Sequence, residues 1–240
     1  MTKPNKADYT KDQWRKLKEK IKLEKAAKRA AKANKLPPRP PIQNTTETSF
    51  VLGNGLSRQP IDLPALKSYG KVYGCNALYR EYDPDYLIAV DVKMVLEINK
   101  HKYQLRNDQV WTNPNKAYTT MSKLNFFQPS KGWSSGPTAL WLASQHGPKQ
   151  IFIIGFDYTG KDNGNHFNNI YADTENYKKS NDGATYHGNW LKQTATTIKE
   201  HPRINYIRVI AKDNYCPEEL NILSNYSTME LEHFLRIFSI

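Results

Sequence analysis

Six short apolar runs alternate with helix-forming segments from Phe50 onward, and this alternation limits the fold more than any other feature of the chain. Several of the runs are continuous rather than alternating, as expected for strands that are covered on both faces. The pattern predicts an α/β domain with a mostly parallel sheet and flanking helices. The predicted strands are residues 50–52, 72–75, 86–90, 110–112, 151–154 and 206–210, and the predicted helices are residues 63–68, 93–99, 136–146 and 189–199.

The end of the chain carries one further helix signal. Residues 227–230 read Ser-Thr-Met-Glu, which matches a capping box at a helix start. We therefore expect a final helix after this box, with Leu231, Phe234, Leu235 and Phe238 on one side.

The N-terminal part of the chain is strongly basic. Residues 1–40 hold fourteen Lys and Arg against four Asp and Glu, whereas the remaining 200 residues hold twenty-one against nineteen. We expect a basic helical arm over residues 1–36, opened by a capping box at Thr10, and a Pro-rich linker over residues 37–48. We expect residues 49–240 to form a nucleotide-binding α/β domain. Residues 1–41 could bind DNA, RNA or another polyanion, or could simply be a solvated arm.

Composition also limits the compartment. Cys75 and Cys216 are the only cysteines, so neither a disulfide framework nor a zinc-ligand spacing is indicated. No apolar run approaches the roughly 20 residues that span a bilayer, and no apolar segment follows the basic N-terminal residues. We expect a cytoplasmic protein without a membrane span.

Polar and glycine residues follow the predicted strands, where ligands bind in open α/β sheets. The first strand ends in Gly-Asn-Gly-Leu-Ser, residues 53–57, and a glycine turn of this kind lets backbone N–H groups approach an anionic ligand. Each feature has an ordinary structural alternative, namely a turn or a helix cap. Together they predict a nucleotide pocket built from Gly53, Asn54, Gly55, Ser57, Asn76, Asp91, Ser134, Ser135, Gly136, Gly155 and Asp157.

A long polar insertion lies between the strand at 151–154 and the helix at 189–199. Insertions of this length are usually functional lids or disordered segments. It contains His166 and His187, and histidine is the natural general base near neutral pH, although either could be an ordinary loop histidine. No spacing of His, Asp or Glu indicates a metal site.

The residues of the body resemble the bacterial sialyltransferases of glycosyltransferase family 42 from about Phe50 to Ile210. That family has a Gly-Asn-Gly-Pro-Ser turn, a Cys-Asn strand end and a Thr-Ser-Gly helix start, which match residues 53–57, 75–76 and 134–136. Its Gly-x-Lys-x-Ile and Gly-Ile-Asp-Phe-Tyr segments match residues 147–151 and 155–158. The sequence departs from the pattern at Leu56, where the family has proline, and at Asp91, where it has asparagine. Short proteins of tailed phages also resemble this chain.

The resemblance implies a single Rossmann-like domain that binds a cytidine nucleotide sugar (a CMP-sugar) as co-substrate and needs no metal. Asn54, Asn76 and Ser135 then hold the nucleotide, and His187, preceded by Tyr186, is the base. Tyr158 and Tyr171 are the candidates for stabilising the departing phosphate.

Two other functions remain open at this point. One is a non-catalytic nucleotide-binding protein, or a regulatory phage protein in the host cytoplasm that binds nucleic acid or protein. The other is a nucleotide pyrophosphokinase in which Asp91 and Asp157 hold magnesium.

Overall fold

The computed structural model describes residues 13–15, 19, 47–118, 120–211 and 215–240. The chain divides into two units, Met1–Pro41 and Ile42–Ile240. In the first unit, residues 13–15 and 19 are helical, as the sequence predicts. The rest of the predicted arm, its cap at Thr10 and most of the Pro-rich linker lie outside the described residues.

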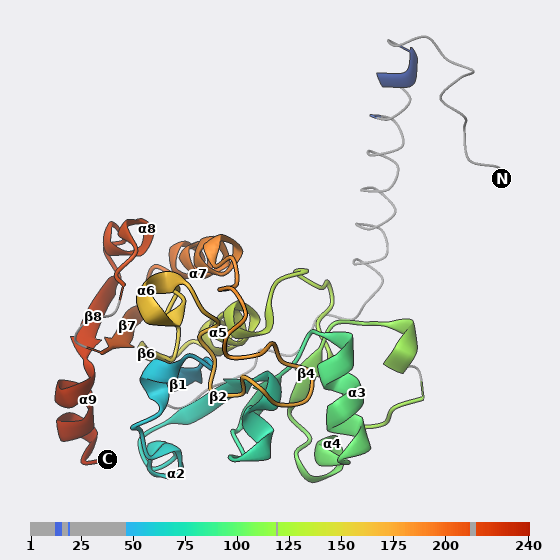
Figure 1. Cartoon of the computed structure of the whole chain (residues 1–240), viewed down its shortest axis with the longest axis horizontal. Helices are drawn as coiled ribbons and strands as arrows, with labels where there is room; N and C mark the ends of the chain where they lie inside the picture. Colours follow the sequence, from blue (N-terminus) through green and yellow to red (C-terminus); the bar gives the residue numbers. More distant parts are fainter. Residues whose placement is uncertain (1–12, 16–18, 20–46, 119, 212–214) are drawn as a thin grey trace. The chain divides into compact units, whose positions relative to one another are not determined.

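The second unit is built on one parallel sheet (Figure 1). The strand order is β5-β4-β3-β2-β1-β6-β7-β8, and every neighbouring pair is parallel. This sheet with its flanking helices confirms the predicted α/β, Rossmann-like fold. The strands are β1 (Thr48–Leu52), β2 (Lys71–Cys75), β3 (Tyr86–Ile88), β4 (Val110–Thr112), β5 (Asn125–Phe126), β6 (Gln150–Ile154), β7 (Asn205–Ile210) and β8 (Tyr226–Glu230).

Helices cover both faces of the sheet, which explains why the strands are continuous apolar runs. Val51 in β1 packs in the same cluster as α5 (Ser135–Gln145) and α7 (Gly188–Glu200). Its neighbours Phe50 and Leu52 point to the other face, toward α2 (Leu63–Leu66), α3 (Val92–Lys100) and α9 (Leu231–Phe238). In Figure 1, α3 lies on the β4 side of the sheet and α9 on the β8 side.

The order in which strands are added to the sheet reverses at β1. Strands β2 to β5 extend from one side of β1, and β6 to β8 extend from the other. Helix α5 makes this change, because it crosses from the edge strand β5 back to β6. The carboxyl ends of β1 and β6 therefore form a topological switch point, where open α/β sheets bind their ligands.

Short elements complete the chain between the strands. They are the 3-10 helices η2 (Leu56–Arg58), η3 (Asn76–Arg80) and η4 (Lys116–Tyr118), and the single-turn helices α4 (Tyr103–Arg106), α6 (Lys161–Gly164) and α8 (Glu218–Asn221). Within the described residues, no helix is both long and apolar enough to span a membrane.

Both edge strands were outside the sequence-based prediction. Strand β5 has only two residues, too few to show a periodicity. Strand β8 occupies the residues that we predicted as a capping box, and that prediction is wrong. Residues 226–230 pair with β7 along its outer edge instead, and the final helix begins at Leu231. The predicted apolar side of this helix is confirmed, because Phe234 and Phe238 are buried.

Candidate functional site

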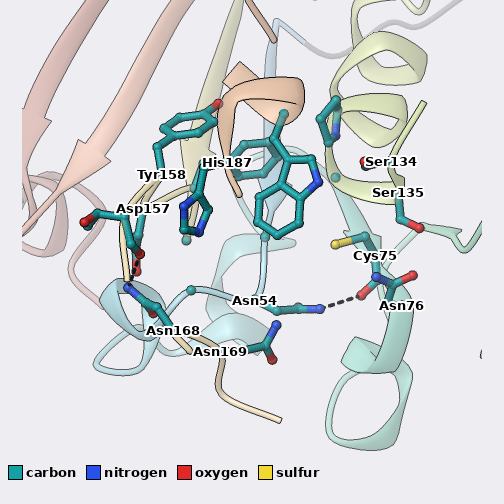
Figure 2. A pocket seen from close by; sticks show the side chains of 18 of the residues that line it. Asn54, Cys75, Asn76, Ser134, Ser135, Asp157, Tyr158, Asn168, Asn169 and His187 are labelled. Carbon is teal, nitrogen blue, oxygen red and sulfur yellow. Dashed lines mark hydrogen bonds between the residues drawn. The ribbon is translucent and has the colours of Figure 1, made fainter. Parts of the chain in front are cut away.

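A cavity of about 270 Å³ lies at the switch point (Figure 2). The turns after β1 and β6, the ends of β2 and β3, the start of α5 and the insertion before α7 all contribute to its wall. Most of the residues predicted for a nucleotide pocket line it. These are Gly53, Asn54, Gly55, Asn76, Asp91, Ser134, Ser135, Gly136, Gly155 and Asp157, together with Tyr158 and His187 from the residues predicted to be catalytic.

The glycines of the first turn do not present their N–H groups to the cavity, as the sequence suggested, but let β1 approach β6. The Gly53 N–H donates to Ile154 O at 2.7 Å, and the Gly55 N–H donates to Gly155 O at 2.9 Å. A Cβ atom on either glycine would lie within 3 Å of the turn after β6. The two glycines therefore let β1 and β6 continue side by side past the end of the sheet, and their N–H groups are used for that contact.

Two asparagine side chains offer unused acceptors at the cavity. Asn54 is 8% exposed and donates its Nδ2–H to Cys75 O at 3.3 Å, as Figure 2 shows. The Oδ1 atoms of Asn54 and Asn76 are buried, with no hydrogen-bond partner in the described part of the chain. A buried polar atom without a partner costs about 1–3 kcal/mol, so a bound ligand with a matching donor would relieve that cost. The backbone of Asn76 is left-handed, with φ at 52°.

The N-terminus of α5 supplies donors at the cavity. Ser134 is the N-cap residue, yet its side chain makes no capping hydrogen bond. The Ser135 hydroxyl accepts the Val90 N–H at 3.1 Å, which ties α5 to the end of β3. Ser134, Ser135 and Gly136 all line the cavity. An uncapped helix start carries unpaired N–H groups and the positive end of the helix dipole, which together favour an anion.

His187 lies across the cavity from Ser135 (Figure 2). Its ring packs edge-on against Trp190, with the ring centroids 5.1 Å apart. Burial lowers the pKa of His187 below its ordinary value, although the negative charge of Asp157 acts in the opposite direction. The imidazole is therefore neutral near pH 7, which is the form that accepts a proton.

The carboxylates at the site have different environments. Asp157 is 6% exposed, and it accepts both the hydroxyl and the backbone N–H of Ser57. Asp91 lines the open cavity, and burial raises the pKa of its carboxyl group. Among the described residues, no lysine or arginine lines this cavity, and no three His, Cys, Asp or Glu side chains gather in a way that could hold a metal ion. Ser57 itself supports the wall without lining it.

The tyrosines that we expected to stabilise a departing phosphate are not arranged for that purpose. The Tyr158 hydroxyl donates to Thr194 Oγ1 at 2.8 Å, and in Figure 2 it points away from Asn54. Tyr171 is buried outside the cavity, where its hydroxyl bonds to Arg58 and Glu81. Tyr186 is 77% exposed and does not line the cavity. Tyr171 therefore has a structural role, and Tyr186 lies on the surface, so neither hydroxyl is placed to contact a phosphate in the cavity.

The insertion at residues 159–187 is attached to the first turn. The Ile170 N–H donates to Asn54 O at 2.8 Å, and the Leu56 N–H donates to Asn168 Oδ1 at 2.9 Å. Arg58 is buried, and its Nε–H donates to Gly53 O at 2.8 Å. Farther along, Arg80 donates to Thr174 Oγ1 at 2.7 Å, and in Figure 1 the insertion runs toward α3. The middle of this segment is therefore a fixed wall of the cavity.

Sequence reasoning missed several residues that line the cavity. Asn168 and Asn169 were part of the polar insertion, but nothing in the pattern set them apart from its other polar residues. Trp190 lies in a predicted helix, where an aromatic residue usually means core packing. The remaining missed residues are Cys75, Pro137, Phe156 and Thr159.

Comparisons with known proteins add no relative. No protein-family model matches the chain, and neither the curated proteins nor the solved structures give a match.

Proposed function

We propose that this chain binds the cytidine nucleotide of a nucleotide sugar in the switch-point cavity and transfers the sugar to an acceptor hydroxyl. The observation that carries the proposal is that one cavity has hydrogen-bond donors in one part of its wall and an unpartnered acceptor in another. The uncapped start of α5 suits the phosphate, and the unpartnered Oδ1 of Asn54 suits a nucleoside or sugar donor group. The sequence resemblance adds the cytidine base to this proposal.

The chemistry follows from the two sides of the cavity. His187, which is neutral, accepts the proton of the acceptor hydroxyl as its oxygen bonds to the anomeric carbon. The bond from that carbon to the phosphate oxygen breaks, and its electron pair leaves with the nucleotide. The N–H groups and hydroxyls at the start of α5 stabilise the negative charge that develops there. None of these steps requires a metal ion.

A second candidate is a nucleotide-binding protein without transferase activity. The observation that favours it is the orientation of the tyrosines, because neither the hydroxyl of Tyr158 nor that of Tyr171 is directed at the cavity. In that case the cavity holds the nucleotide, and His187 only packs against Trp190.

Thermal unfolding of the full chain with CMP, CTP, UDP or ATP, with and without magnesium, tests the proposal. Ligand at 100 times its Kd stabilises a protein by about 2.7 kcal/mol, which corresponds to roughly 5–10 °C for a domain of this size. We expect CMP to raise Tm by that amount, equally in EDTA and in magnesium. No shift with any nucleotide would contradict both candidates, whereas a shift without hydrolysis or transfer of a CMP-sugar would select the second.

The basic residues 1–41 carry a separate proposal, which rests on composition alone. Their lysines and arginines would tether the enzyme to a nucleic acid without sequence preference, and this binding would weaken steeply with salt. Deleting residues 1–41 should lower DNA affinity and leave CMP affinity unchanged. Unchanged DNA affinity would refute the tether.

A further inference from the structure

The outer edge of β8 is open at one end of the sheet (Figure 1). In the part of the chain that the structure describes, β8 pairs with β7 alone, and Thr228 at its centre is exposed. Natural sheets protect such edges with proline, lysine, a bulge or a covering segment. Residues 226–230 contain neither proline nor lysine, and they pair with β7 without a bulge. An edge of this kind can accept a further strand.

The hydrogen-bond ladder shows which main-chain groups of β8 point outward. The Tyr206 N–H donates to Asn225 O, so the odd-numbered residues of β8 bond to β7 and the even-numbered residues face the outer edge. Two of the outward groups are used within the chain. The Tyr226 N–H donates to Leu223 O, and the C=O of Glu230, the N-cap residue of α9, belongs to the first helical turn.

The outward groups that remain free match a second copy of the same edge. They are the N–H and C=O of Thr228, the N–H of Glu230 and the C=O of Tyr226, none of which bonds to another described residue. If a second β8 runs antiparallel with its own Thr228 opposite the first, the two Thr228 residues exchange two hydrogen bonds. Each Glu230 N–H then meets the Tyr226 C=O of the other copy. Every free group of the two edges is used, and no group that is already bonded within the chain is needed.

The side chains beside the edge are compatible with this pairing. A two-fold axis normal to the sheet reverses the strand and keeps its faces, so α8 meets α8 on one face and α9 meets α9 on the other. Ile222, the C-cap residue of α8, is 70% exposed, and Ile237 in α9 is 50% exposed, so each face offers an apolar side chain. Glu230 lies opposite Tyr226 and not opposite another carboxylate, so the pairing sets no like charges against each other.

We infer that β8 is a dimerisation edge, at which two copies of this chain pair their β8 strands antiparallel about Thr228. The two eight-stranded sheets then join into one. A strand from another protein would need a matching pattern of free groups, whereas a second copy supplies that pattern by symmetry. The exposed isoleucines add the apolar contact that such a short strand lacks, since stable interfaces bury roughly 1,600 Å². The inference does not depend on the proposed function, because no residue of β8 lines the switch-point cavity.

Sedimentation equilibrium of the full chain and three variants tests the inference. A reducing buffer excludes a disulfide through the exposed Cys216. We expect the wild-type chain to form a dimer, with twice the chain mass of 27.7 kDa. Thr228→Pro removes an N–H that the fold does not use, so it should weaken the dimer about tenfold or more and leave the far-UV circular dichroism unchanged. Thr228→Val, the matched control, keeps the N–H and should remain dimeric. Thr228→Lys sets two like charges directly opposite and should also dissociate.

A monomeric wild-type chain would overturn the inference. A Thr228→Pro chain that stays as dimeric as wild type would overturn it as well, because the interface would then lie elsewhere. If Thr228→Pro does not fold, Thr228→Lys decides the question, since a longer side chain at this exposed position leaves the ladder with β7 intact. Dissociation of that variant supports the dimerisation edge, and an unchanged dimer contradicts it. Titration with CMP reports on the proposed function separately and should give the same Kd for all four proteins.

Discussion

The Ser57 hydroxyl donates to the Asp157 carboxylate and joins the turn after β1 to the turn after β6. The backbone N–H of Ser57 donates to the other carboxylate oxygen at 3.2 Å, so both oxygens are engaged. One buried carboxylate thus holds the two halves of the switch point together. Because contacts within the chain shape the cavity, the cavity is preorganised for a ligand.

Removal of this carboxylate should damage both the fold and the binding site. Asp157→Ala leaves the Ser57 N–H without its acceptor, so we expect the free energy of unfolding to fall by about 1–3 kcal/mol. CMP affinity should fall at least tenfold because the first turn loses its support. Urea unfolding and calorimetric titration measure the two effects. Ser68→Ala, at an exposed serine, is the control, and an Asp157→Ala protein as stable as that control would rule out the bracing role.

Gly55 tests the close approach of the two turns. A Cβ there would lie within 3 Å of both the Asp157 carboxylate and Gly155 O, so Gly55→Ala should cost about 1–3 kcal/mol of stability. The matched control is Gly183→Ala, because a Cβ at Gly183 meets nothing within 4 Å. Chemical denaturation of both variants gives the comparison. Equal stabilities would mean that the first turn has room for a side chain.

The pH dependence of transfer should report on His187. Because the folded-state pKa of His187 lies below its ordinary value of about 6.5, kcat/KM should rise with pH along a limb centred below 6.5 and level off by neutral pH. His187→Gln should lower kcat by about 10²–10⁴ with little change in CMP affinity. His166→Gln is the matched control, since His166 pairs with Asp162 outside the cavity. Full activity in His187→Gln would remove that residue from the role of base.

Tyr171 should behave as a structural residue. Its hydroxyl is buried between Arg58 and Glu81, so Tyr171→Phe should lower stability by about 1 kcal/mol. The value of kcat should stay within about twofold of wild type, because the hydroxyl does not reach the cavity. Tyr186→Phe, at an exposed position, should change neither quantity. A large loss of kcat at normal stability in Tyr171→Phe would restore the phosphate role that the sequence suggested.

His146 should make the fold sensitive to acid. This histidine is 3% exposed, its Nδ1 contacts the Tyr73 hydroxyl, and burial lowers its pKa to about 4. Since the unfolded chain binds this proton near pH 6.5, stability is greatest above 6.5, falls as the pH decreases toward 4 and levels off below that. The free energy of unfolding falls by about 3 kcal/mol over this pH range. His146→Gln should remove this contribution to the pH dependence of the free energy of unfolding, measured by urea unfolding between pH 7 and 4. An unchanged pH dependence would contradict the lowered pKa of His146.

The sequence was informative where a residue's environment is local. Continuous apolar runs identified six of the strands, because burial on both faces leaves little room for polar residues. The polar strand ends converged because parallel strands end at one edge of the sheet.

The prediction that Gly53 and Gly55 present their N–H groups to a ligand was wrong. No local sequence pattern shows that β6 will lie against β1 and use those N–H groups. The hydroxyl directions of Tyr158 and Tyr171 depend on Thr194 and Arg58, which are distant in sequence. Strand β8 satisfied a helix-capping pattern and still paired with β7, because tertiary pairing outweighed the local signal.

The position of the phosphate in a crystal structure with bound CMP would show whether the switch-point cavity binds a nucleotide. We expect the phosphate oxygens to lie within hydrogen-bond distance of the Ser135 and Gly136 N–H groups, with the nucleoside extending toward Asn54 and Asn76. Electron density for CMP elsewhere on the chain, or a phosphate beyond hydrogen-bond distance of the start of α5, would contradict nucleotide binding at the switch point.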